Sequence, residues 1–321
     1  MSRHSFLSAT LTILTMLGCG GDSTAPELPQ FDPDAVDITN AVFTSQEADC
    51  SEYEGSFFAN VRDVGRNRPF TGQVEIVQGS DACSLTSNSI PNHDFNVNGA
   101  FATNVSEVIE TFSIDATPTF EAQSTALSLN YDNAVFLNGV KLDLLAAACY
   151  GIGGAPLGQE RIGCNQPDTP WRYDPMATGN GFGTDANHAH TQPDGAYHYH
   201  GDPLAMYDLS GTTASGVIGF AADGFPIFGP YISDNGTVRR VESGFTLKPG
   251  ARVSQGGEGA FPGGDYDGTF IDDWEWTDAG DLDACNGMEV AGVYGYYVTD
   301  SYPWVLACFR GSPDPSFRKG R

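Results

Sequence analysis

Short apolar runs separated by Gly and Pro recur along most of the chain. Val, Ile, Phe, Tyr and Thr are concentrated at residues 72–77, 216–221, 225–231 and 293–299. Runs of β-branched and aromatic residues between turn formers are typical of strands. The pattern therefore predicts a mainly β protein with sandwich-like, layered antiparallel sheets, long loops and few short helices.

Helical periodicity is rare in this sequence. Residues 105–111 and 142–150 are the two windows in which we expect short helices. No internal repeat is evident, and no later apolar run is long enough to predict a transmembrane helix. The loops between strands therefore make up much of the expected fold.

The first 18 residues have the pattern of an export signal. Arg3 precedes an apolar run at residues 6–17, which is too short to span a bilayer as a mature helix. Residues 16–19 read Met-Leu-Gly-Cys and resemble a bacterial lipobox, in which the cysteine becomes lipidated. We expect a lipoprotein signal peptide at 1–18 and lipidation of Cys19. The alternative is an ordinary secretory signal with a chance cysteine.

The chain after Cys19 divides by composition into three further regions. Residues 19–35 are rich in Gly, Pro and acidic residues and predict a flexible tether. We expect a small disulfide-closed β region at 36–86 and a larger domain at 87–315. Gly20, rather than Asp, resembles lipoproteins of the outer membrane, so we expect an exported, lipid-anchored protein on its periplasmic or cell-surface face.

Seven cysteines are present, and lipidation of Cys19 would leave six. An even number of cysteines in an exported chain predicts three disulfides, which could pair in fifteen ways. We favour the pairs that are local in sequence. A zinc–thiolate site is the alternative, but no Cys-x-x-Cys pair occurs. The expected disulfides are Cys50–Cys83, Cys149–Cys164 and Cys285–Cys308.

Four histidines fall within thirteen residues and form two His-x-His pairs. Side chains two apart on a strand point to the same face, so each pair is a two-pronged ligand. The pairs are separated by Pro193, Asp194 and Gly195, which are typical of a tight turn. The four histidines are His188, His190, His198 and His200.

The length of the turn decides whether these histidines converge. A three-residue loop pairs Gln192 with Ala196, so that His190 lies opposite His198. The same register places His188 opposite His200, and cross-strand partners share a face. A two-residue loop would instead split the cluster between two faces. We expect the first arrangement, in which all four imidazoles converge.

Convergent neutral imidazoles outside the cell suit Cu(II) or Zn(II). Copper could use four nitrogens, whereas zinc would take three and leave a position for water. Asp185 and Asp202 flank the pairs and could orient the imidazoles. The alternative is a hairpin with incidental histidines.

Residues 194–201 read Asp-Gly-Ala-Tyr-His-Tyr-His-Gly and are similar to the signature of the YHYH-domain family of exported proteins. Segments at 89–93, 137–140, 222–230, 267–270 and 281–287 resemble the same family in order. The resemblance covers about residues 88–311 and implies that His93 belongs to the main domain and approaches the hairpin as a further possible ligand. It implies no particular reaction, because the family is named for its motif.

Three classes of function fit these residues. The first is a cell-envelope lipoprotein that binds copper or zinc through the histidine hairpin. The second is an extracytoplasmic metalloenzyme, a zinc hydrolase or a copper redox enzyme, that uses the same site. The third is a glycan-binding or Tyr/His lyase module without metal. The catalytic candidates are Tyr197, Tyr199, His93 and Asp223.

Charge and composition limit the partners. Asp and Glu number 41 against 15 Lys and Arg, so we expect no nucleic acid partner. A solvated acidic loop is the simplest reading of the carboxylates after residue 264, and a calcium site at Asp265, Asp267 and Asp272 is the alternative. Metal ions and a membrane, through the lipid anchor, are the partners that we expect. Protein partners are unknown from the sequence.

The lipobox generates a first testable prediction. Cys19→Ser should abolish lipidation, because the thiol that would carry the lipid is absent. Membrane fractionation and intact mass measure the change, with Cys50→Ser as the control that keeps the lipobox. An unchanged mass shift and membrane fraction in Cys19→Ser would show that the lipobox interpretation is wrong.

Overall fold

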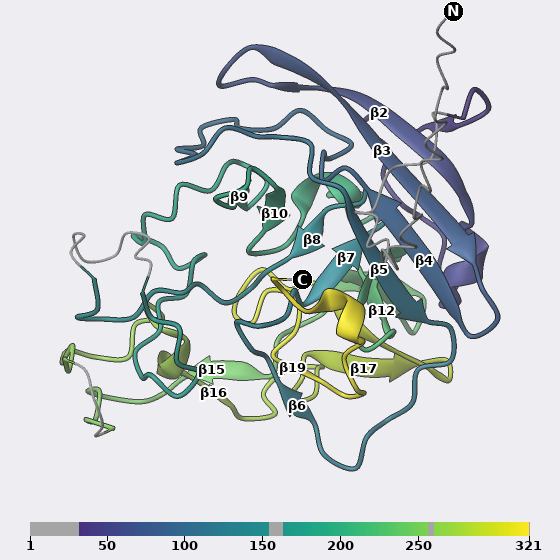
Figure 1. Cartoon of the computed structure of the whole chain (residues 1–321). Helices are drawn as coiled ribbons and strands as arrows, with labels where there is room; N and C mark the ends of the chain where they lie inside the picture. The colour runs from purple at the N-terminus through teal and green to yellow at the C-terminus, as the bar shows by residue number, and fades with distance from the viewer. Residues whose placement is uncertain (1–31, 154–162, 256–259, 321) are drawn as a thin grey trace, which may run out of the picture.

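A computed structural model describes residues 32–153, 163–255 and 260–320, and it is mainly β with only short 3₁₀ helices. Figure 1 shows the N-terminal strands as a long curved sheet beside a second sheet at the centre of the molecule. The predicted fold class is therefore confirmed. The predicted signal peptide, Cys19 and most of the tether lie outside the described residues.

The first sheet has the order β1-β2-β3-β4-β5 and is antiparallel except between β1 and β2. Apolar and polar residues alternate in β3, so that Phe70, Val74 and Ile76 are buried while their neighbours are more exposed. This alternation is the period of a strand with one face on the core. The strands are β1 (Val36–Asp37), β2 (Gly55–Asp63), β3 (Arg68–Gln78), β4 (Ala82–Ser87) and β5 (Glu110–Asp115).

The second sheet is mixed and has the order β17-β18-β12-β11-β7-β8-β10-β9. The pairs β12–β18 and β10–β8 are parallel, and the other neighbours are antiparallel. Every residue of its central strands is buried, which explains their continuous apolar sequence. Its strands are β7 (Ala134–Phe136), β8 (Lys141–Leu142), β9 (Ala189–Thr191), β10 (Tyr197–Tyr199), β11 (Val217–Ala221), β12 (Pro226–Phe228), β17 (Gly287–Val290) and β18 (Val293–Tyr297).

Short hairpins, bridges and 3₁₀ helices complete the described chain. The paired strands are β13 (Tyr231–Asp234) with β14 (Thr237–Arg240), β15 (Phe245–Leu247) with β16 (Trp274–Trp276), and β6 (Thr125–Ala126) with β19 (Cys308–Phe309). The 3₁₀ helices span Cys50–Tyr53, Leu204–Met206, Ile271–Asp273 and Pro315–Phe317. Within the described ranges, no helix has the length and apolar character needed to cross a membrane.

The two large sheets share one hydrophobic core. Gly139, in the turn between β7 and β8, has φ 80°, and an added Cβ would lie 2.5 Å from Ser87 Cβ and 2.7 Å from Val74 Cγ2. Ser87 Oγ also donates to the carbonyl of Gly139 at 2.5 Å. A side chain would therefore separate the sheets at this point, which is why a glycine is required.

The two expected helices are wrong. Phe112 and Ile114 are both buried on β5, so the apolar period after residue 109 is two rather than 3.6. In the 142–150 window the backbone bonds to distant segments, with Asp143 N donating to Tyr199 O and Tyr150 N to Trp171 O. Hydrogen bonds to distant segments therefore determined the conformation of both windows.

The region at 36–86 does not form a sheet of its own. Its last strand, β4, pairs along its whole length with β5, which lies beyond residue 86. Its buried residues also belong to the same core cluster as the second sheet. The division of the chain at residue 86 stays a prediction.

All three predicted disulfides are confirmed. Cys50–Cys83 ties the first 3₁₀ helix to β4, and Cys149–Cys164 closes a loop beside the second sheet. Cys285–Cys308 joins the segment before β17 to β19. The three bridges join cysteines that are close in sequence, with separations of 33, 15 and 23 residues.

Disulfide removal gives a second testable prediction. The double variant Cys50→Ala/Cys83→Ala should lose about 3–4 kcal/mol of unfolding free energy, because a cross-link restricts the unfolded chain more as its loop lengthens. Cys149→Ala/Cys164→Ala closes a shorter loop and should lose about 3 kcal/mol. Denaturant unfolding measures both. A larger loss for the shorter loop would contradict the loop-length argument.

Candidate metal centre

The histidine hairpin has the register that the turn predicts. His190 pairs with His198, and Gln192 N donates to Ala196 O at 2.9 Å across a three-residue loop. Gly195 closes the loop with φ 96°, a conformation that glycine adopts without strain. The expected pairing continues outside the strands, where His200 N donates to His188 O at 2.8 Å.

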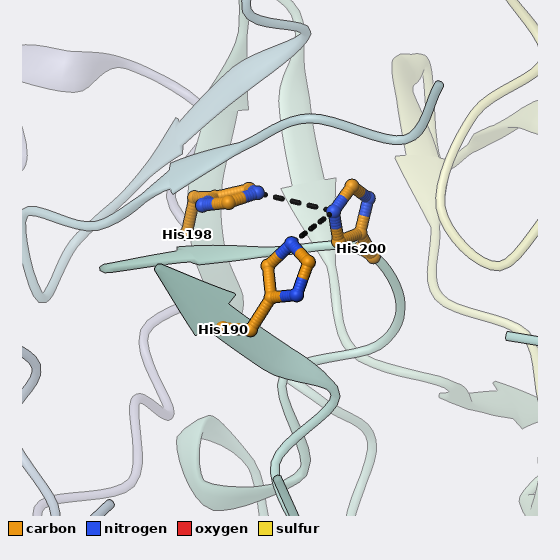
Figure 2. A group of neighbouring side chains, drawn as sticks. All are labelled: His190, His198 and His200. Carbon is orange, nitrogen blue, oxygen red and sulfur yellow. Dashed lines mark hydrogen bonds between the residues drawn. The ribbon is translucent and has the colours of Figure 1, made fainter. Parts of the chain in front are cut away.

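Three imidazoles converge on one side of this hairpin. Figure 2 shows the rings of His190, His198 and His200 with their Nε2 atoms turned toward one another. His200 Nε2 lies 3.0 Å from His198 Nε2 and 3.0 Å from His190 Nε2. All three side chains are buried, and their ligand atoms lie within 4.8 Å of one another. The hairpin therefore forms a compact cluster of three nitrogen ligands.

Hydrogen bonding alone satisfies this cluster poorly. The Nε2 atom of His200 carries either one hydrogen or one lone pair, yet it faces two other nitrogens at 3.0 Å. The two contacts must therefore share a single hydrogen or a single lone pair of His200 Nε2. A single cation between the rings, in contrast, accepts a lone pair from each nitrogen.

The surroundings of His198 and His200 favour neutral rings. Burial, followed by the neighbouring His200 and His190, holds the pKa of His198 well below its ordinary value. Burial and then His190 lower the pKa of His200 in the same way. His190 Nδ1 lies 2.6 Å from Phe182 O; a proton on Nδ1 leaves Nε2 as a lone pair aimed at the cluster. Neutral imidazole is the form that binds metal.

His188 does not join the other three, so the expectation that all four imidazoles converge is wrong. Strand β9 begins only at Ala189, and His188 has φ 63°, which breaks the alternation of side chains. Its Nδ1 lies 2.5 Å from Asp202 Oδ1. Burial lowers the pKa of His188, but the hydrogen bond and charge of Asp202 outweigh it and raise the pKa above its ordinary value.

The catalytic candidates His93, Tyr197 and Tyr199 lie together, but apart from the triad. The two tyrosines alternate with His198 on β10 and therefore point to the opposite face. Tyr199 OH lies 2.7 Å from His93 Nε2, and Tyr197 OH donates to Asp185 Oδ2 at 3.0 Å. His93 thus approaches the hairpin, as the resemblance implies, yet it is not in the ligand group. These buried side chains form a core network, which argues against a lyase of sugar polymers.

Asp223, the fourth catalytic candidate, lies in a separate network. Its Oδ2 accepts hydrogen bonds from Tyr296 OH at 2.6 Å and from the backbone N–H groups of Arg310 and Gly311. Burial outweighs these hydrogen bonds and raises its pKa. Asp223 therefore anchors the C-terminal segment to β18.

The acidic loop after residue 264 uses its carboxylates within the protein. Arg252 Nη2 donates to Asp267 at 2.5 Å and to Asp273 at 2.6 Å. Asp272 accepts from the backbone N–H of Trp171 at 2.8 Å. Among the residues that the structure describes, Asp265, Asp267 and Asp272 do not form a ligand cluster. The calcium alternative therefore lacks structural support.

A second group of possible ligands, Asp49 with Cys50 and Cys83, does not fit a metal. Its ligand atoms lie within 4.8 Å of one another. The two sulfurs are joined in a disulfide, however, and a thiolate is the form of cysteine that ligates. The histidine triad is the better candidate.

The triad opens on a pocket of about 230 Å³. Besides the three histidines, its wall contains Asp143 and Lys319, whose Oδ2 and Nζ atoms lie 2.5 Å apart. Neither residue was predicted from the sequence. Asp143 and Lys141 are the two charged residues in the otherwise apolar segment 140–145, a signal that could have marked Asp143, but Lys319 comes from a distant segment with no such signal.

The fold and the site define a mainly β, disulfide-bonded protein with a buried three-histidine cluster at the edge of a mixed sheet. Residues 111–311 match the model of the family described as YHYH protein, which covers more than half of the chain. The chain belongs to this family, and the predicted resemblance is confirmed. No curated protein and no solved structure matches the chain.

The hairpin turn gives a third testable prediction. A side chain at Gly195 would be strained at φ 96°, and its Cβ would lie 2.7 Å from Ser106 Oγ and 2.9 Å from Asn104 O. Gly195→Val should therefore lower the unfolding free energy by about 2–5 kcal/mol, from backbone strain plus overpacking. Gly236→Val is the matched control, because Gly236 has φ 83° but no atom within 4 Å of the added Cβ. Equal losses in denaturant unfolding would contradict the close approach at Gly195.

Proposed function

We propose that the protein binds one transition-metal ion, zinc or copper, through the Nε2 atoms of His190, His198 and His200. The observation that carries this proposal is the meeting of three buried nitrogens around His200 Nε2, with two contacts of 3.0 Å. Such contacts leave lone pairs opposed unless a cation or a shared proton lies between them. His188 and His93 are not ligands in this proposal, because neither belongs to the cluster.

The spacing of the nitrogens suits a single ion. With metal–nitrogen bonds of about 2.0–2.1 Å, two nitrogens are about 2.9 Å apart at a right angle and about 3.4 Å apart in a tetrahedron. The contacts of 3.0 Å lie within that range. Imidazole binds both zinc and copper well, and three ligands leave at least one coordination position open.

Metalloenzyme activity is the second candidate, and the pocket favours it. A closed site would suit storage or transport of the ion, whereas this triad opens on a pocket of about 230 Å³. Catalytic zinc sites keep three protein ligands and an open position for water. Hydrolysis of a small activated ester by the zinc-loaded protein tests this class, with the metal-free protein as the control.

We further propose that this metal-binding protein is exported and lipid-anchored in the cell envelope, at the outer membrane. The export-like N-terminal sequence supports this proposal. Three disulfides also suit an oxidising compartment. Fractionation of native cells would test the location.

Metal titration of single variants gives a fourth testable prediction. Elemental analysis of protein purified without added metal should find close to one zinc or copper ion per chain. His190→Ala and His198→Ala should each lower metal affinity by at least about 100-fold, more than loss of an outer group. The double variant should be little worse than either single variant, because the second change acts on a site already broken.

His188→Ala is the matched control for these variants. His188 is a neighbour on the same hairpin, but its ring is held by Asp202 rather than by the triad. Its removal should change metal affinity by less than about tenfold. Equal losses in all three single variants would remove the special role of the triad, and unchanged affinity in His190→Ala and His198→Ala would overturn the metal proposal.

A further inference from the structure

One carboxylate stands in the wall of the pocket beside the triad. Asp143 directly follows β8, and its N–H donates to Tyr199 O at 2.9 Å. Because β8 pairs in parallel with β10, the sheet itself places Asp143 next to the strand that carries His198. Asp143 is the single acidic residue among the described residues that line this pocket.

The two oxygens of Asp143 differ in their environment. Oδ2 accepts from Lys319 Nζ at 2.5 Å and lies 3.4 Å from the donor Gln192 Nε2. Oδ1 is buried and has no hydrogen-bond partner in the part of the chain that the structure describes. A buried carboxylate oxygen without a donor is unfavourable, so Oδ1 keeps an unused capacity to accept a hydrogen bond.

Asp143 is too far from the histidines to be a fourth ligand. Its oxygens are not in the group whose ligand atoms lie within 4.8 Å of one another. A water or hydroxyl group bound to an ion stands about 2.1 Å from it and donates over about 2.7 Å, so it reaches an acceptor almost 5 Å from the ion. A carboxylate in the pocket wall suits that role.

We propose that Asp143 is a positioning residue that accepts a hydrogen bond from the ligand at the open coordination position. The site would then prefer small ligands that donate a hydrogen bond, such as water or an alcohol, over bare anions. Lys319 donates to Oδ2, so Oδ1 is the oxygen that would accept the hydrogen bond from this ligand. This inference rests on the proposed metal site, and it adds the chemical class of the exchangeable ligand.

Azide binding to the Cu(II)-loaded full chain tests the proposal. Azide is an anion without a hydrogen to donate, so the Asp143 carboxylate should disfavour it. In Asp143→Asn, azide should bind about tenfold more tightly, because the negative charge beside the open position is gone. The azide-to-copper absorption band gives the dissociation constant. Copper stoichiometry should stay the same as in the wild type, since Asp143 is not a ligand.

Asp132→Asn is the matched control. Asp132 is equally buried and lies 3.7 Å from the same Lys319 Nζ, but it is not among the residues that line the pocket. Burial, opposed by Lys141, raises the pKa of Asp132 to about 7, so the titrations are run at pH 8, where its carboxylate is largely charged. Its azide affinity should stay within about threefold of the wild type, since the lost charge is farther from the open position.

The outcomes separate this inference from the metal proposal. Equal azide affinity in Asp143→Asn and the wild type would overturn the positioning role, as would an equal gain in Asp132→Asn. A loss of copper from Asp143→Asn in folded protein would show that Asp143 is a ligand and would also overturn it. If the wild type itself binds no metal, the proposed function fails first. Circular dichroism establishes that each variant is folded.

Discussion

The pairing of β9 with β10 is the interaction on which the candidate metal centre depends. Pairing His190 with His198 puts their imidazoles on one face, and His200 joins them from just beyond the strand. A shift of one residue would send one of the two histidines to the opposite face. The register is held at both ends, by the turn at Gly195 and by the bond between His200 N and His188 O.

Side chains alternate along β10, so its tyrosines lie on one face of the strand and His198 lies on the other. Tyr197 and Tyr199 face a buried network with His93 and Asp185, in which the polar atoms have protein partners. His198 belongs to the triad, and its Nδ1 has no hydrogen-bond partner among the residues that the structure describes, while its Nε2 lies 3.0 Å from His200 Nε2. The tyrosine face thus anchors the strand through hydrogen bonds, and the histidine face presents ring nitrogens that could bind a ligand.

Charge is distributed unevenly around this site. The chain carries a formal net charge of −26, yet the pocket beside the triad is flanked by a buried ionic network with two lysines. Lys141 pairs with Glu110 at 2.6 Å, and Lys319 pairs with Asp143 at 2.5 Å. The two lysines therefore offset the charges of Glu110 and Asp143 beside the site.

The sequence by itself determined the fold class and the register of the histidine hairpin. Apolar runs between Gly and Pro predicted the β class, and the Pro193–Gly195 turn predicted the hairpin register, because both depend on neighbours in the chain. Tertiary structure decided the rest. Asp202 holds His188 away from the triad, long-range pairing turned two expected helices into strand and loop, and the fold brought Asp143 and Lys319 together from segments 176 residues apart. Such contacts form only when the sheets pack, so no local pattern in the sequence records them.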